Sequence, residues 1–155
     1  ENYSVLMAVY FKEKPEYLKA SMESMMSQTV PTNDFVLVCD GPLTPELNMV
    51  IEEMQQKYGD VIRTIRLEKN SGLGHALQIG VKECYNDLIA RMDSDDISRS
   101  YRCEDELKIL MAHPEISVVG SVIEEFSTTP DVIDAKRVVP ETSEEIIETH
   151  LIIHL

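Results

Sequence analysis

Short apolar runs alternate along the chain with stretches whose apolar residues recur at helical spacing. Residues 4–10 and 35–39 are apolar runs typical of strands buried on both faces of a sheet, and residues 61–67 predict a third strand. Residues 15–28 and 45–58 carry apolar side chains three and four positions apart, and each stretch begins with a proline, which the first turn of a helix tolerates. This part of the chain therefore predicts strands that alternate with helices.

The alternation continues through the middle of the chain. Residues 73–84 place apolar side chains on one helical face, residues 88–90 predict a short strand, and residues 91–96 predict a dense polar turn. A helix over residues 101–112 then leads to a strand over residues 116–126. Strict alternation with short connections predicts an α/β fold, a Rossmann-like and mostly parallel sheet with helices on both faces.

The pattern is weaker after residue 126. Residues 136–139 predict a short strand, and residues 142–151 predict a capped helix. The length of 155 residues suits a single domain over residues 1–155. Because the apolar Leu-Ile-Ile-His-Leu at the end carries no stop signal, we expect the chain to be a truncated piece of a longer protein.

The net charge of the chain limits which partners it can bind. The 14 Lys and Arg residues and 28 Asp and Glu residues give a net charge of −14, which repels phosphate backbones and makes nucleic acid an unexpected partner. An anion would need local help from a metal ion, placed cations or a helix N-terminus.

Cys39, Cys84 and Cys103 show no disulfide or zinc spacing, and no transmembrane run or export signal is found, so we expect a cytoplasmic protein.

The densest group of acidic residues follows the fourth predicted strand, where Asp93, Asp95 and Asp96 stand within four residues. Crowded carboxylates repel unless a cation neutralises them, and hard oxygen ligands suit Mg²⁺ or Mn²⁺ that also binds substrate phosphates. Two other interpretations are capping of the next helix and a calcium loop. The calcium loop is disfavoured because Ile97 and Ser98 stand where an EF-hand needs an oxygen ligand and a glycine.

The other turns at strand ends carry weaker signals. Because the carboxyl ends of parallel strands meet at one edge, we expect the turns at residues 10–12, 40–42, 70–74 and 93–96 to gather there. Residues 70–74 could present backbone N–H groups to an anion, or form a turn and nothing more. Asp40 could accept hydrogen bonds from a nucleobase or a ribose, or stabilise its own turn.

Taken together, these segments resemble the family 2 glycosyltransferases over about residues 4–126. The resemblance implies the GT-A fold, an α/β domain that binds a nucleotide sugar. Four motifs in the family's order carry it. They are the strand at 4–10 with Ser27-Gln28-Thr29 ending the next helix, Val38-Cys39-Asp40-Gly41-Pro42, Asn70-x-Gly72-x-x-x-Ala76-x-x-x-Gly80, and Asp93-Ser94-Asp95-Asp96.

The resemblance also implies a role for these turns. Asp40 would contact the base of the nucleotide. Asp93 and Asp95 would touch the ribose and hold Mn²⁺ or Mg²⁺ on the diphosphate, with Asp95 the stronger metal candidate. The full set of nucleotide-binding residues implied in this way is Ala8, Val9, Tyr10, Asp40, Asn70, Gly72, Asp93 and Ser94.

Some positions depart from the family pattern. Cys39 stands where many members carry a further acidic residue, and Gln78 where an Asn is frequent. Inverting members place an acidic catalytic base in the acceptor half, well after the acidic motif. Glu124 and Glu125 do not match that spacing, so we expect the base to lie beyond residue 155, in an acceptor-binding half missing from this chain.

These implications lead to one hypothesis: the chain is the nucleotide-sugar-binding part of an inverting, metal-assisted glycosyltransferase in polysaccharide or cell-envelope glycan synthesis. The expected donor is a nucleoside-diphosphate sugar, with a UDP-sugar favoured, and the expected acceptor is a hydroxyl of a glycan or lipid-linked glycan at the inner face of the membrane. A sugar-phosphate nucleotidyltransferase is the first alternative, although it should have a glycine-rich loop where residues 8–12 have no glycine. A non-enzymatic, receiver-like divalent-cation module is the second, although it should have an acidic pair after the first strand.

Overall fold

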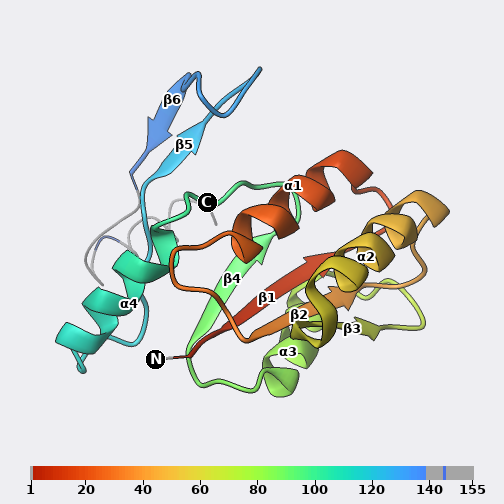
Figure 1. Cartoon of the computed structure of the whole chain (residues 1–155), viewed down its shortest axis with the longest axis horizontal. Coiled ribbons are helices and arrows are strands. Elements are labelled where there is room, and N and C mark those ends of the chain that lie inside the picture. The colour runs from red at the N-terminus through yellow and green to blue at the C-terminus, as the bar shows by residue number, and fades with distance from the viewer. Residues whose placement is uncertain (1, 139–144, 146–155) are drawn as a thin grey trace. The chain divides into compact units, whose positions relative to one another are not determined.

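The computed structural model describes residues 2–138 and 145 (Figure 1). Glu1–Leu107 forms one compact unit, and Lys108–Leu155 forms a second. Among the described residues, no helix combines the length and the apolar character that a membrane crossing requires.

The first unit is built on a four-stranded, fully parallel sheet. The strand order is β3-β2-β1-β4, so the chain moves outward from β1 to β3 and then returns to the other side of β1 for β4. This return makes the carboxyl ends of β1 and β4 the point where the winding direction reverses. The strands are β1 (Ser4–Val9), β2 (Asp34–Cys39), β3 (Ile62–Arg66) and β4 (Ile89–Asp93).

Local sequence signals explain where the helices begin and end. α1 (Pro15–Met26) and α2 (Pro45–Tyr58) both start with a proline, and the Thr44 hydroxyl accepts a hydrogen bond of 3.3 Å from the Leu47 N–H at the start of α2. A 3₁₀ turn, η1 (Gly59–Val61), follows α2, and the remaining helices are α3 (Leu73–Glu83) and α4 (Arg102–Ala112).

The two faces of the sheet carry separate apolar layers, because successive strand residues point to opposite sides. One layer joins β-strand residues such as Met7 and Cys39 to α1, α2 and the first turns of α4, including Cys103. The other layer joins Leu6 and Val38 to α3 and includes the half-buried Cys84. The prediction of an α/β sheet covered on both faces is confirmed.

The second unit corrects one predicted strand. Residues 116–126 do not extend the parallel sheet; within this range only β5 (Ile123–Glu125) is a strand, and it pairs antiparallel with β6 (Ala135–Arg137). Residues 116–122 are largely exposed and contain Gly120 among serines, which weakens a buried strand. The strand predicted over 136–139 overlaps β6, and the helix predicted over 142–151 lies outside the described residues except Glu145, which is helical.

Candidate functional site

The carboxyl ends of the four strands meet at one edge of the sheet (Figure 1). Val9 lies opposite Cys39, which in turn lies opposite Arg66, and Ala8 lies opposite Asp93. The sequence prediction of a turn over residues 91–96 is wrong in its first half, because β4 continues through Asp93. The longer strand places the Asp93 carboxylate at the sheet edge itself, next to the end of β1.

Asp40 ties the end of β2 to the start of α3. The residue is 4% exposed, and its two carboxylate oxygens accept hydrogen bonds from the Ser71 N–H at 2.8 Å and the Gly72 N–H at 2.9 Å. The Asn70 side-chain amide donates to the Asp40 carbonyl at 3.3 Å. A carboxylate at a helix N-terminus satisfies N–H groups that lack partners in the helix and suits the helix dipole. The structure therefore brings Asp40, Asn70 and Gly72 into one cluster.

Two glycines make this close approach possible. Gly41 has a φ of +88°, and a Cβ atom there would lie 2.5 Å from the Asn70 backbone nitrogen. Gly72 has a φ of +93° and is the N-cap residue of α3. Residues with a Cβ adopt such angles only with strain, so both positions favour glycine.

The acidic turn is held on the other side of β1. The Ser21 hydroxyl in α1 donates to the Asp93 carbonyl at 2.7 Å, and the Arg91 guanidinium pairs with the Asp93 carboxylate. The Ser94 hydroxyl donates to the Glu13 carboxylate at 2.5 Å, which joins this turn to the loop between β1 and α1. Glu13 is a functional candidate that the sequence pattern does not mark, because a lone glutamate after a strand gives no signal of a role.

Tyr10 opens that loop and is 42% exposed beside Phe11, whose ring centroid lies 5.8 Å from the Tyr10 ring at an interplanar angle of 76°. Val9 is buried and Ala8 half-buried, so their side chains fill the sheet rather than line an open surface. Of the three predicted residues at this strand end, Tyr10 is the most exposed.

The acidic turn crowds three carboxylates together, with Arg91 paired to one of them. Burial and the carboxylates of Asp95 and Asp93 raise the pKa of Asp96, which the guanidinium groups of Arg91 and Arg102 offset only in part. Within the part of the chain that the structure describes, no three His, Cys, Asp or Glu side chains converge as metal ligands. One or two carboxylates suffice for Mg²⁺ or Mn²⁺ when phosphates and water complete the shell, so the exposed Asp95 and the half-buried Asp93 have the chemistry for such an ion.

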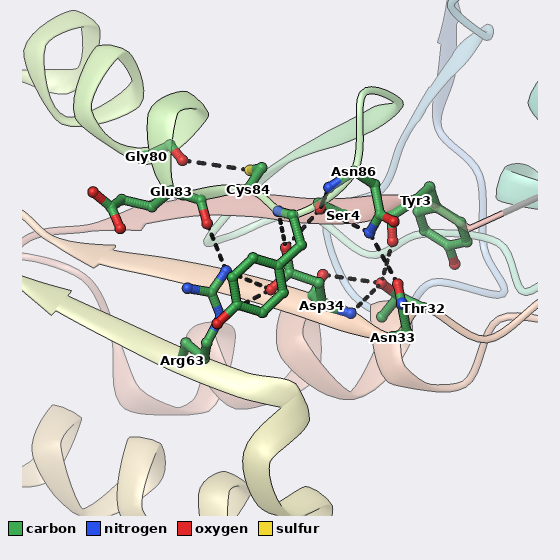
Figure 2. Close-up of polar contacts among 11 residues, drawn as sticks. Tyr3, Ser4, Thr32, Asn33, Asp34, Arg63, Gly80, Glu83, Cys84 and Asn86 are labelled. Atoms are coloured by element: carbon green, nitrogen blue, oxygen red, sulfur yellow. Dashed lines mark hydrogen bonds and ion pairs between the residues drawn. The ribbon is translucent and has the colours of Figure 1, made fainter.

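The opposite edge of the sheet holds a different polar network (Figure 2). Asp34 is 1% exposed and accepts hydrogen bonds from the Ser4 hydroxyl at 2.6 Å, the Tyr85 N–H at 2.8 Å and the Arg63 guanidinium at 2.6 and 2.9 Å. Burial alone would raise the pKa of Asp34, but these donors outweigh it and leave that pKa below its usual value. The Asn86 backbone and side chain both donate to the Ser4 hydroxyl at 3.1 Å.

Comparison with known proteins agrees with this geometry. A family model described as Glycosyl transferase family 2 matches residues 4–153. An uncharacterized glycosyltransferase of Haemophilus influenzae is 39% identical over 94% of this chain and 54% of its own length. The UDP-Gal:alpha-D-GlcNAc-diphosphoundecaprenol beta-1,3-galactosyltransferase of Escherichia coli is 38% identical over 83% of this chain and 46% of its own length. The chain thus spans about half the length of these relatives.

Solved structures share the fold. S. aureus TarS 1-349 in complex with UDP has a TM-score of 0.64 at 23% identity, over 74% of this chain and 33% of that one. The mannosyltransferase PcManGT from Pyrobaculum calidifontis, in complex with GDP-Man and Mn²⁺, has a TM-score of 0.63 at 14% identity, over 70% of this chain and 32% of that one. The family match and the 39% identical relative together place this chain in glycosyl transferase family 2.

Proposed function

We propose that this chain binds the nucleoside-diphosphate part of a sugar donor at the carboxyl edge of its sheet, as the donor-binding part of an inverting glycosyltransferase. The observation that carries the proposal is that two hydrogen-bonded polar turns lie on either side of β1, at the carboxyl ends of β2 and β4. One is the Asp40 cluster with Asn70 and Gly72, and the other is the acidic turn that begins at Asp93. The crevice at a switch point between such strand ends is where open α/β sheets bind ligands.

The base belongs on the Asp40 side of this edge. The Ser71 and Gly72 N–H groups are taken by the Asp40 carboxylate, so they do not form an anion hole for the diphosphate. The exposed Asn70 side chain can instead bind the base through its amide group. Each Asp40 carboxylate oxygen accepts one hydrogen bond from the loop and has a second lone pair for a ligand donor. Tyr10, exposed at the end of β1, provides an aromatic surface on the same edge.

The diphosphate belongs on the acidic side, with Mn²⁺ or Mg²⁺ between it and Asp95 and Asp93. The chain's net charge of −14 opposes a free diphosphate, and the crowded carboxylates near Asp96 favour a cation at this turn. A bound divalent ion supplies charge stabilisation for the departing diphosphate. Among the fold's solved neighbours, one was crystallised with UDP and another with GDP-Man and Mn²⁺, which supports this class of donor and ion.

The acceptor and the catalytic base are proposed to lie outside this chain. The matched relatives are about twice as long, and one of them acts on a diphosphoundecaprenol-linked sugar. Another is an amylovoran biosynthesis glycosyltransferase of Erwinia amylovora, 40% identical over 80% of this chain. We place the full-length protein in polysaccharide or cell-envelope glycan synthesis, in the cytoplasm at the inner face of the membrane.

Calorimetric titration of UDP tests the proposal directly, with Mn²⁺ and with EDTA, on the wild-type chain and on Asp95→Asn. We expect Mn²⁺ to increase the UDP affinity of the wild-type chain. In Mn²⁺, the UDP affinity of Asp95→Asn should be lower than that of the wild type by about tenfold or more, because this variant lacks one proposed metal-binding carboxylate. Asp60→Asn, an exposed aspartate in η1 at the other edge, serves as the matched control and should bind like the wild type. A folded wild-type chain that binds no UDP under either condition would contradict the proposal.

A further inference from the structure

The acidic turn lies on backbone without regular secondary structure. Between the end of β4 at Asp93 and the start of α4 at Arg102, residues 94–101 form neither helix nor strand. Asp95 and Asp96 are exposed on this segment, so its conformation decides where their carboxylates point. Such a segment keeps a fixed shape only if other parts of the fold hold its backbone.

One face of α1 holds that backbone at both ends. The Ser21 hydroxyl donates to the Asp93 carbonyl at 2.7 Å, just before the acidic residues. The Ser24 hydroxyl accepts a hydrogen bond of 3.0 Å from the Ser98 N–H, just after them. Gln28 extends the same row, because its side-chain amide donates to the Arg99 carbonyl at 2.9 Å and to the Ser98 hydroxyl at 3.2 Å.

Gln28 also reaches the next helix. Its side-chain oxygen accepts a hydrogen bond of 3.0 Å from the Cys103 N–H in the first turn of α4, and its amide donates to the Ser24 carbonyl at 3.0 Å within α1. A single side chain therefore bonds the end of α1, the end of the acidic segment and the start of α4.

These polar side chains are buried where apolar ones would pack as well. Ser21 and Ser24 are three residues apart on one face of α1, and Gln28 follows the end of that helix. Their exposed fractions are 0%, 9% and 6%. A buried polar group destabilises a fold unless it is hydrogen-bonded. Each of these three side chains has a partner between Asp93 and Arg99, and Ser24 and Gln28 have further partners in α1 and α4. These three side chains therefore connect α1 to the segment that carries Asp95.

We infer that Ser21, Ser24 and Gln28 are positioning residues that fix the Asp93–Ser98 backbone and so aim Asp95 at the donor's divalent ion. The inference rests on the proposed function, because it needs a metal-dependent donor site at this turn. Residues that orient metal ligands from behind contribute strongly to metal affinity, and their loss typically costs about tenfold to a hundredfold.

The test compares serine-to-alanine changes along α1. Ser24→Ala and Ser21→Ala each remove one hydrogen bond to the acidic segment. Ser27→Ala, at the C-cap of α1, is the matched control, because among the residues that the structure describes the Ser27 hydroxyl bonds the Ser24 carbonyl at 3.2 Å and no group of the acidic segment. UDP affinity is measured by calorimetry with Mn²⁺ and with EDTA, and amide hydrogen exchange is followed at Ser98.

We expect Ser24→Ala to weaken UDP binding in Mn²⁺ by about tenfold, to leave binding in EDTA unchanged, and to speed exchange at the Ser98 amide. Ser27→Ala should change none of the three. A purely structural role would weaken binding equally in Mn²⁺ and EDTA, and that result overturns the inference. Should Ser24→Ala fail to fold, Ser21→Ala carries the same test.

The two proposals fail in different ways. Wild-type protein whose UDP binding gains nothing from Mn²⁺ overturns both the metal part of the proposed function and this inference. Wild-type protein that gains from Mn²⁺, with Ser24→Ala and Ser21→Ala gaining equally, overturns this inference alone. An equal loss in Ser27→Ala also overturns it, because it points to general damage of α1.

Discussion

Strand β2 carries a buried aspartate at each end, and the two have opposite surroundings. Asp34, its first residue, meets the Arg63 guanidinium, the Ser4 hydroxyl and the Tyr85 N–H at the amino edge (Figure 2). Asp40, directly after its last residue, meets the N–H groups of Ser71 and Gly72 at the carboxyl edge. Both carboxylates accept backbone N–H groups that flank α3, one after its end and one at its start.

The difference lies in charge compensation. Arg63 neutralises Asp34, whereas no Lys or Arg pairs with Asp40 among the residues that the structure describes. A buried, neutralised carboxylate is a structural element, while one held only by backbone dipoles keeps a net charge that a ligand can use. At the amino edge, the charge of Asp34 is therefore neutralised by Arg63. At the carboxyl edge, Asp40 is hydrogen-bonded but its charge is not neutralised. We call these the closed edge and the open edge.

The largest effect should come from the closed edge. Asp34→Asn keeps the size of the side chain but removes the charge opposite Arg63, and we expect the free energy of unfolding to fall by about 3 kcal/mol. Urea unfolding measures it. The double variant Asp34→Asn with Arg63→Met should be no less stable than Asp34→Asn alone, because the uncompensated guanidinium is gone. Additive losses would show that the ion pair is not the cause.

Part of the same free energy should be lost in acid. The pKa of Asp34 is below its usual value in the folded chain, so the carboxylate contributes stability above the unfolded pKa of about 3.9, and that contribution is lost as pH falls through the folded pKa. Unfolding curves between pH 3 and 7 should therefore fall less steeply with acid in Asp34→Asn than in the wild type. Parallel profiles would contradict the assignment.

A smaller effect is expected at the open edge. Asp40→Asn retains one oxygen acceptor and loses the other, so one of the Ser71 and Gly72 N–H groups loses its partner, at about 1–2 kcal/mol. UDP affinity should fall both in Mn²⁺ and in EDTA, unlike the metal-specific loss in Asp95→Asn. Ser71→Ala, which removes the hydrogen bond of 3.4 Å from the Ser71 hydroxyl to the Lys69 carbonyl, is the control for general loosening of the loop. Loss of stability with unchanged UDP affinity would reduce Asp40 to a structural role like that of Asp34.

The smallest effect should be a gain. Asp96→Asn removes one of three crowded negative charges, so the metal-free chain should become more stable by less than about 1 kcal/mol. Thermal unfolding in EDTA measures it, with Asp60→Asn as the matched change at a distant exposed position. A lower melting temperature for Asp96→Asn would mean that its carboxylate caps the segment instead of repelling its neighbours.

Most of the first unit could be predicted from sequence, because buried parallel strands and amphipathic helices leave clear periodic signals. The strand at residues 116–126 was wrong because an apolar run alone does not say whether a partner strand is present to bury it. The fourth strand was predicted to end at residue 90, because the polar Arg91 and Asp93 are typical of a turn. The pattern could not show that these two side chains pair with each other within β4.

The candidate site was predictable in its positions but not in its contacts. Spacing put Asp40 and Asn70 at the same edge, yet it could not show that the Asp40 carboxylate is already engaged with the Ser71 and Gly72 N–H groups. The bond from Ser94 to Glu13 and the row of polar residues on α1 join segments about seventy to eighty residues apart. Such pairings depend on tertiary packing, which local patterns do not encode. The metal ligands and the catalytic base stay predictions.

The three cysteines give each face of the sheet a chemical reporter. Burial raises the pKa of the Cys39, Cys84 and Cys103 thiols, so little reactive thiolate exists while the fold is closed. Alkylation of the buried Cys39 and Cys103 then requires that the α1 and α2 side open, whereas the half-buried Cys84 on the α3 side should react faster. The rates at which Cys39 and Cys103 are modified therefore measure how often their layer opens.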